Sequence, residues 1–507
     1  MEIHWIDLTI FIAYLIAMLL VGVYFLRKNT SDEDYYVGGR GMGAGHIGLS
    51  VVATDVGGGF SIGLGGLGFV MGISGSWMLF TGLLGAWISA VLLIPKLYPL
   101  ASKYKFLSFP DALKFHYNAR VALVAGIISL IGYIGFTSSQ ILAGAKLASA
   151  TFPSIGITEA VLIMGVIAVV YTVMGGIKAV IYTDTVQWII LMAGLIFIGI
   201  PLGYQAVGGM TGIQNAVGDE FLSLNNLTWS QLVNWLITIV PIWFVGMTLY
   251  QRIYACRDEK TAKKAWRVAG LFEWPIMAFM GVLLGLFARV AFEQGMFTDI
   301  GFAPGSKMDA ELGLPLLLRS ILPVGLMGLM MSAYFSAIMS TADSCLMAAS
   351  GNLTNDIIKR SSADVGQDEI LDEKEIRKTD HKTNIRYSQW VTFAIGALAI
   401  LLATIMTNVL DLMLYSYAFM VSGLFVPVIG MLVLKKPSPR AAIWAMIIGG
   451  STTLITTEML KRMQTTLPYE LDANILGITM SALVFIIIQN WKLPGKGTAR
   501  MMTTGKI

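Results

Sequence analysis

The chain has 507 residues, of which 56% are hydrophobic and only 13% are charged. Soluble domains carry about 25% charged residues, so this composition excludes an ordinary soluble globular protein and predicts a protein embedded in lipid. The net charge of +4 comes from basic residues scattered between apolar segments, which argues against a nucleic-acid partner. The two cysteines and four histidines show no metal-ligand spacing.

Apolar segments long enough to cross a bilayer as helices recur from one end of the chain to the other. They predict an all-α membrane protein with about thirteen spanning helices in a single transmembrane domain over residues 1–507. The predicted spans are 5–26, 44–71, 76–100, 120–149, 158–175, 182–206, 231–254, 266–293, 316–350, 386–407, 410–433, 438–460 and 472–491.

Basic residues gather in alternate loops, which the positive-inside rule assigns to the cytoplasm. Examples are Arg27 with Lys28, Lys103 with Lys105, and Lys435 with Lys436. An odd number of spans places the two ends on opposite sides, so we predict a multi-pass protein of the cell membrane with its N-terminus outside and its C-terminus in the cytoplasm. The polar segment 361–384 is predicted to be a solvated cytoplasmic linker.

The second span contains an interruption with a charge beside it. Its residues 50–61 read SVVATDVGGGFS, with Asp55 preceding three consecutive glycines. Backbone groups must be paired in hydrocarbon, and a carboxylate there costs at least about 2.5–3.5 kcal/mol, so the combination favours a cation-binding break. The alternative is that the glycines only permit close helix packing, although that leaves the acid unexplained.

The seventh span, 231–254, can also unwind, because Pro241 and Gly246 lie in its middle. It comes five spans after the first break. Two interrupted helices at corresponding places in consecutive five-helix units are typical of inverted-repeat transporters, whose substrate site lies between the breaks. Proline is common in membrane helices, so Pro241 alone is weak evidence for an interrupted span.

The ninth span places oxygen atoms on one helical face. Ala337, Ser340, Thr341 and Ser344 share that face by their spacing of three and four residues. Sodium prefers several oxygen ligands, and unwound carbonyls of the second span could complete such a set. The alternative is that the hydroxyls only bond to carbonyls of their own helix.

One further acid, Asp184, lies at the start of the sixth span. It either takes part in ion binding or is a helix-terminal acid favoured by the helix dipole. Metalloprotease and serine-hydrolase motifs such as HExxH and GxSxG are absent from the sequence, so we do not predict an enzyme.

Several motifs together resemble the sodium/solute symporter family, which includes sodium-coupled carriers of proline, sugars, sialic acid, pantothenate and choline. The matching motifs are residues 34–40, the break at 53–59, Gly175-Gly176, Thr183-Asp184 with Gln187, Gln251-Arg252 and residues 340–344. The resemblance implies a leucine-transporter-type fold, with two inverted five-helix repeats, one extra helix before them and two after. It also implies sodium-coupled symport of a small organic solute by alternating access.

The resemblance also implies site residues, with sodium as the coupling ion. The first sodium site would comprise Ala53, Val56, Ala337, Ser340 and Thr341. A second sodium, found in some members, would be held by Asp184, Ser340, Asp343 and Ser344. This chain has Asp343 where the two-sodium sialic acid carriers have serine, so the geometry of the second site need not carry over.

The substrate is less constrained than the ion. Asp55 resembles the acid of proline carriers and could support the cation or pair with an amine, which favours an amino compound, while a sugar, choline or monocarboxylate symporter or a sodium-binding sensor stays open. The expected pocket residues are Gly58, Phe60, Ser61, Ser139, Gln140, Trp243, Met247 and Tyr250. Arg40 either gates the cytoplasmic side or only follows the positive-inside rule. The predicted partners are a small solute and the bilayer, with no obligatory protein partner evident.

Overall fold

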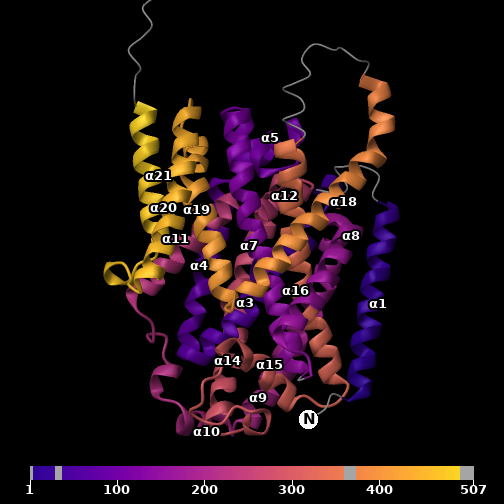
Figure 1. Cartoon of the computed structure of the whole chain (residues 1–507), viewed down its shortest axis with the longest axis vertical. Helices are drawn as coiled ribbons and strands as arrows, with labels where there is room; N and C mark the ends of the chain where they lie inside the picture. The colour runs from indigo at the N-terminus through magenta and orange to yellow at the C-terminus, as the bar shows by residue number, and fades with distance from the viewer. Residues whose placement is uncertain (1–3, 29–36, 153, 359–372, 491–507) are drawn as a thin grey trace, which may run out of the picture.

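The structure, a computed structural model, describes residues 4–28, 37–152, 154–358 and 373–490. Within these ranges the chain is built from helices, and the one strand-like feature is a backbone bridge between Met42 and Cys256 (Figure 1). This confirms the predicted all-α class. The start of α1 and the end of α21 lie at opposite ends of the bundle, as an odd number of spans requires (Figure 1).

The first half of the chain follows the predicted spans closely, because long apolar segments of this kind are the strongest helix signal in a membrane protein. Its elements are α1 (Trp5–Lys28), η1 (Gly38–Arg40), α3 (Ala44–Met71), η2 (Gly72–Ser76), α4 (Trp77–Leu92), α5 (Ile94–Tyr104), α6 (Phe109–His116), α7 (Ala119–Thr151), α8 (Ile157–Gly194), η3 (Leu195–Gly199), α9 (Ile200–Ala206) and α10 (Gly209–Ala216).

The second half contains more interruptions. Its elements are η4 (Asp219–Leu222), α11 (Trp229–Val245), α12 (Met247–Ala255), α13 (Glu259–Leu271), η5 (Phe272–Met277), α14 (Ala278–Glu293), η6 (Thr298–Ile300), α15 (Ala310–Ile321), α16 (Leu326–Gly351), η7 (Asn352–Ile358), α18 (Glu373–Ile405), α19 (Val409–Val433), α20 (Pro439–Met463), η8 (Pro468–Glu470) and α21 (Ala473–Asn490).

The prediction of one continuous ninth span over 316–350 is wrong. The structure divides this segment into α15 and α16, separated by residues 322–325. Pro323 lacks the N–H that a continuing helix needs, and Gly325 has a φ of 88°, which is outside the right-handed helical region. The spanning helix therefore begins ten residues later than predicted, and α15 is a separate short helix.

The element α8 contains the predicted span 158–175 and the first part of 182–206. Ala160 and Ile163, near its start, line the same cavity as Met327 and Met331 of α16, while Gly194 at its end lies against Met330. A straight helix would separate residues 160 and 194 by about 51 Å. Because both ends reach the same part of α16, α8 reverses direction between them, as two spans require.

Two helices are interrupted where the sequence predicts breaks. In α3 the break is at Gly57, with φ 43° and ψ −167°, and α11 meets α12 at Gly246 with a bend of 45°. Among the described residues seven helices are long and apolar enough to cross a membrane, or eight if α11 and α12 form one span. The total of about thirteen spans stays a prediction, as does the linker at 361–384, of which residues from Glu373 onward are described and helical.

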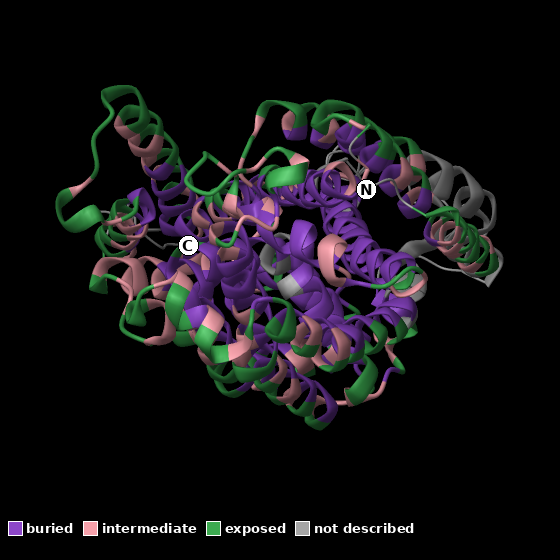
Figure 2. Ribbon diagram, turned by 90° about the horizontal axis from the view of Figure 1, so that it is seen from below, coloured by how far each residue is buried: buried purple, intermediate pink, exposed green. Residues whose placement is uncertain are grey.

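The surface of the bundle is apolar, as lipid contact demands. Buried residues occupy the middle of the helix bundle and exposed residues surround them (Figure 2). Large hydrophobic side chains such as Phe197 (75% exposed) and Trp390 (71% exposed) lie on this outer surface. An outer face of this kind fits a protein surrounded by hydrocarbon, because a soluble protein rarely exposes contiguous apolar area.

Candidate functional site

The break in α3 lies directly against α16. The Thr341 hydroxyl donates to the Ala53 carbonyl (2.8 Å) and to the Ala337 carbonyl (3.2 Å). A Cβ added to Gly57 would lie 2.5 Å from Thr341 Oγ1, and one added to Gly58 would lie 2.0 Å from Ile338. Only glycines permit this approach, so the three-glycine sequence brings the backbone oxygens of α3 to the hydroxyl face of α16.

Ser340 is next to this contact but turns toward α8. Its hydroxyl donates to Asp184 Oδ1, and Ser50 of α3 donates to Asp184 Oδ2 (2.6 Å). All three side chains are buried. The Asp184 carboxylate thus accepts one hydrogen bond from a hydroxyl of α3 and one from a hydroxyl of α16.

A fully buried arginine compensates the charge of Asp184. The guanidinium of Arg252, on α12, forms an ion pair with Asp184 at 3.8 Å, and both side chains are 0% exposed. Each of its nitrogen atoms also donates to an oxygen: Ser50 Oγ (3.2 Å), Thr54 Oγ1 (2.5 Å), Ser344 Oγ (2.8 Å) and the Thr248 carbonyl (3.2 Å). We call Asp184, Arg252, Ser50, Thr54 and Ser344 the arginine cluster.

The residues predicted for a second sodium site therefore lie in two different environments. Asp184 and Ser344 belong to the arginine cluster, in which a protein cation is already present. Asp343 instead accepts a hydrogen bond of 2.5 Å from Thr172 of α8. Its second carboxylate oxygen has no hydrogen-bond partner among the described residues, although the side chain is 0% exposed.

Four predicted site residues in the break cannot be placed. The side chains of Asp55, Val56, Phe60 and Ser61 lie outside the described part of the chain. Their predicted roles stay predictions.

The remaining predicted substrate residues are buried and belong to α3, α7, α11 and α12. Ser139 donates to the Phe136 carbonyl (2.7 Å) and receives a bond from the Gln140 amide (3.2 Å), both within α7. The Trp243 ring packs against Gly85 of α4 and Trp266 of α13, with a ring distance of 6.2 Å to the latter. This position fits the packing alternative for an aromatic residue as well as a substrate role.

Met247 and Tyr250, on α12, face the short helix α6. The Phe109 N–H donates to the Met247 sulfur (3.1 Å), and the Phe109 and Tyr250 rings meet edge to face at 4.9 Å. The Tyr250 hydroxyl donates to the Phe244 carbonyl (2.8 Å). Their substrate role stays a prediction.

Arg40 joins the two segments that precede α3 and α6. Its guanidinium donates to the Phe106 carbonyl at 2.6 Å. Close by, the Met42 N–H donates to the Ala255 carbonyl (3.1 Å) and the Arg257 N–H donates to the Met42 carbonyl (3.3 Å). Backbone hydrogen bonds thus connect the segment before α3 with the end of α12. They join the two interrupted spans at this end of the bundle.

Several important residues were quoted in motifs but given no role, or were not predicted at all. Arg252, Ser50 and Thr54 belong to the first kind, and Tyr14 of α1 to the second. A usable signal existed for Arg252, because an arginine and an acid within spanning segments are expected to pair in the bundle interior. No spacing rule connects residue 252 to residue 184, so only the fold identifies that pair.

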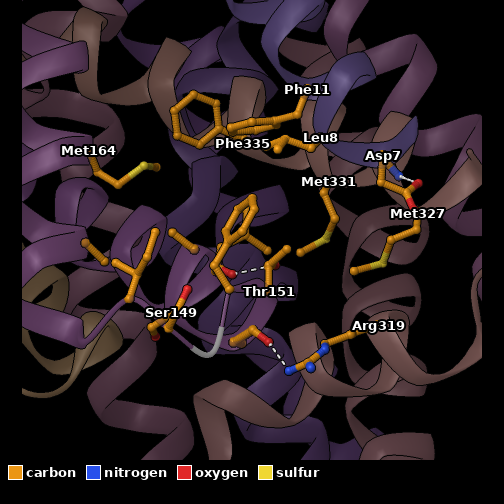
Figure 3. Close-up of a pocket in the computed structure, with 18 of the residues that line it drawn as sticks. Asp7, Leu8, Phe11, Ser149, Thr151, Met164, Arg319, Met327, Met331 and Phe335 are labelled. Atoms are coloured by element: carbon orange, nitrogen blue, oxygen red, sulfur yellow. Dashed lines mark hydrogen bonds between the residues drawn. The ribbon is translucent and has the colours of Figure 1, made fainter. Parts of the chain in front are cut away.

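Two cavities lie on the α1 side of α16. The larger has a volume of about 1210 Å³, and Figure 3 shows Phe11 and Phe335 at one end of it and Arg319 at the other. The smaller, of about 90 Å³, has an almost wholly apolar surface, with Leu15, Ile167, Phe335 and Met339 in its lining beside Asp343 and residues that carry hydroxyl groups. Neither cavity is lined by a predicted substrate residue.

Comparison with known proteins gives a consistent picture. A family profile described as "Sodium:solute symporter family" matches residues 35–449. The chain is 27% identical over 503 residues to the osmoregulated proline transporter OpuE of Bacillus subtilis (strain 168), covering 96% of this chain and 95% of that protein. It is also 27% identical to the sodium/proline symporter of Escherichia coli (strain K12), covering 88% and 87%.

A solved structure has the same fold. It is the substrate-bound, outward-open state of a sodium-coupled sialic acid symporter, with a TM-score of 0.75 over 96% of this chain and 98% of that one. At 20% sequence identity the likeness concerns the fold alone.

Proposed function

We propose, from the premise that this chain belongs to the sodium:solute symporter family, that its coupling sodium binds where the break in α3 meets α16. The chain is a transporter and not an enzyme: a sodium-coupled symporter of a small solute, spanning the cell membrane several times. The proposed ligands are the oxygens of Ala53, Val56, Ala337, Ser340 and Thr341.

The contact of Thr341 with two carbonyls carries this proposal. One hydroxyl proton now bridges the carbonyl oxygens of Ala53 and Ala337, which would otherwise repel each other. A sodium ion at this place can take over that role, because the hydroxyl can rotate to offer a lone pair while both carbonyls turn to the ion. The ion would hold the break in α3 and α16 together, which couples its binding to the shape of the neighbouring solute site.

For the solute we propose an amino compound, with proline as the first candidate. Support comes from Asp55, whose carboxylate could pair with an amine, and from relatives that are named as proline transporters. The sialic acid symporter of the same fold keeps an acidic sugar as the alternative.

Alternating access requires the cytoplasmic side to open and close, and Arg40 is our candidate for a residue of that gate. Its bond to the Phe106 carbonyl and the pairing of Met42 with the end of α12 hold the interrupted elements together on one side. We propose that these contacts separate in the inward-open state. Loops rich in Lys and Arg support placing this side, and the C-terminus, in the cytoplasm.

The test is solute uptake into liposomes that contain the purified protein. An inward sodium gradient is compared with an equal potassium gradient, using labelled proline, other amino acids, sialic acid, glucose and choline. We expect sodium-dependent accumulation of proline above the outside concentration. One sodium that crosses about 100 mV and a tenfold gradient provides roughly 3.7 kcal/mol, enough for accumulation of several hundredfold.

The outcomes separate the two parts of the proposal. Sodium-driven accumulation of another compound in the panel would show that the solute is wrong while the coupling is right. Accumulation that is equal in sodium and potassium would contradict the sodium site itself.

A further inference from the structure

The large cavity beside α1 takes no part in the proposed sodium site at the break in α3. Its walls come from α1, the end of α7, the start of α8, α15 and α16. Its volume of about 1210 Å³ exceeds the roughly 300–1,000 Å³ that is typical of small-molecule sites. A single amino acid or a sodium ion would leave most of this space unfilled.

The helix α1 is held in place beside the cavity, so a small shift of α1 cannot close it. Near the start of α1, Asp7 Oδ1 accepts from the N–H groups of Gly325 (2.8 Å) and Gly328 (2.6 Å), where α16 begins. One helical turn further along, the Phe11 and Phe335 rings meet edge to face at 5.3 Å. Protein interiors contain few voids larger than a water molecule, so another molecule is expected to occupy this space.

The cavity reaches the outer surface of the bundle, which faces hydrocarbon. Leu8 and Ile12 of α1 and Ile163 of α8 line the cavity, and these side chains are 42–47% exposed. The helix α1 runs along the edge of the bundle (Figure 1). In a chain that spans the membrane, the molecules with access to such an apolar opening are lipids.

The lining changes from apolar to polar along the cavity. Phe11, Phe335 and Met164 lie at one end, and Arg319 and Ser149 lie at the other (Figure 3). This arrangement matches an amphiphile, because a hydrocarbon chain and a polar head group need opposite surroundings. The polar residues of the lining are Asp7, Ser149, Thr151, Ser154, Asp299 and Arg319.

Arg319, near the end of α15, is the basic residue among the described residues that line the cavity. Its Nη1 donates to the Ala150 carbonyl at 3.0 Å, which holds the guanidinium at the polar end. A guanidinium carries five N–H donors in a planar fork, and this fork fits two oxygens of one phosphate group. The polar end is therefore suited to the phosphate of a lipid head group.

Two carboxylates accompany Arg319 in the lining and restrict the head group further. The Asp7 carboxylate accepts from the start of α16, while Asp299, in η6, is exposed. A head group with a phosphate alone would be attracted by Arg319 but repelled by Asp299. A head group that also carries an ammonium group offers a charge of each sign, so charge complementarity favours a zwitterionic phospholipid.

We propose that this cavity binds one phospholipid of the ethanolamine type. Its phosphate contacts Arg319 and its ammonium group faces Asp299. One acyl chain fills the space between α1 and α16 as far as the Phe11–Phe335 ring pair. The lipid thereby connects α1 to the rest of the bundle. This inference requires only that the chain spans the membrane, and it is independent of the proposed solute and of the proposed sodium site.

The experiment uses the purified full chain in detergent, from which loosely bound lipid has been removed. Phosphatidylethanolamine, phosphatidylglycerol and diacylglycerol with identical acyl chains are added back in turn. Native mass spectrometry counts the bound lipid, and thermal unfolding measures its effect, because a lipid that binds the folded state raises the melting temperature. We expect one tightly bound phosphatidylethanolamine per chain and the largest rise with this lipid. An equal rise with either of the other lipids would overturn the assignment of the head group.

Arg319→Gln tests the contact with the phosphate. The concentration of phosphatidylethanolamine at half-maximal stabilisation should increase about tenfold or more. Arg319→Lys should lie between the two, because lysine keeps the charge without the planar fork. Arg289→Gln is the matched control, a partly exposed arginine of α14 outside the cavity. Equal behaviour of Arg319→Gln and Arg289→Gln would overturn the phosphate contact.

Met331→Trp tests the place of the acyl chain. Met331 of α16 lies between the two ends of the cavity, so the larger ring should occupy the space and abolish the tightly bound lipid in the mass spectrum (Figure 3). Met459→Trp is the matched control, because this methionine of α20 is 54% exposed and outside the cavity. Retention of the lipid by a folded Met331→Trp variant would show that the chain does not lie in this cavity.

Discussion

Asp184 and Asp343 are two buried acids on neighbouring helices whose surroundings differ. Both side chains are 0% exposed, but Asp184 accepts hydrogen bonds from the hydroxyls of Ser340 and Ser50, while Asp343 accepts one from Thr172. Asp184 also has the guanidinium of Arg252, which is fixed to α12, while Asp343 has an oxygen with no partner among the described residues.

Asp184 therefore has a permanent cation of the protein beside it, and Asp343 has none among the described residues. A tethered guanidinium compensates its acid throughout the transport cycle, so the arginine cluster is suited to hold α3, α8, α12 and α16 together. Asp343 has no such cation among the described residues, and its hydrogen-bond donor there is one hydroxyl of α8.

The largest effect is expected from removing the permanent cation. Arg252→Met should destabilise the protein by about 3–5 kcal/mol, because Asp184 would stay buried and unpaired. The measurement is the free energy of unfolding in detergent. Arg257→Met is the matched control, since its side chain is 68% exposed and its ion pair with Asp258 lies on the surface, where water screens both charges and little change is expected.

A second substitution isolates the cause. Asp184→Asn in the Arg252→Met background should recover part of the lost stability, because it removes the uncompensated charge. Stability of Arg252→Met equal to that of the wild type would mean that Asp184 is neutral in the folded protein and that the comparison with Asp343 does not hold.

The next largest effect concerns the break in α3. Gly57→Ala should cost about 1–3 kcal/mol, because the φ of 43° is unfavourable for alanine and the new Cβ would meet Thr341 Oγ1 at 2.5 Å. Gly45→Ala is its control in the same helix, where no atom lies within 4 Å of the new Cβ. Melting temperatures of the two variants, with and without sodium, measure the difference. Equal effects would show that the break does not need a glycine.

How much of the fold and of the candidate site can be predicted from the sequence depends on how far apart in the chain the interacting residues lie. The all-helical class and the two breaks follow from hydrophobic length and from glycine and proline positions, and helical spacing places Ala337 and Thr341 on one face. That Ala53 lies beside them is implied by the family resemblance. The separation of α15 from α16 is not predicted, because Pro323 and Gly325 lie within a long apolar segment that has the length of a single span. The pairing of Arg252 with Asp184 and the contribution of α1 to the Asp343 cavity depend on the tertiary arrangement, which no local pattern encodes.

A smaller effect tests the sodium site at the break alone. Thr341→Val removes the hydroxyl that bonds to Ala53 and Ala337 with little change of volume, so sodium should bind about tenfold more weakly. Thr137→Val is the matched control, a buried hydroxyl of α7 that bonds only within its own helix. Sodium-dependent melting gives both affinities. A wild-type response of Thr341→Val would remove Thr341 from the ligand set.

The smallest effect comes from an acid without a cation at the surface, where water can partly take the place of a cation. Asp472 is exposed and precedes α21, outside the membrane-spanning helix. Desolvation by neighbouring groups, and secondly the charge of Asp411, raise the pKa of Asp472 from 3.8 to about 6. The folded state therefore binds this proton more tightly than the unfolded state does, so stability should decline as the pH rises from about 4 to 6 and then level off.

Asp472→Asn should remove this decline in melting curves at pH 4, 5, 6 and 7. The change should be well below that of Arg252→Met, because solvent screens an exposed charge and screens a buried one much less. An equal slope of melting temperature against pH in the variant would show that another group causes the decline.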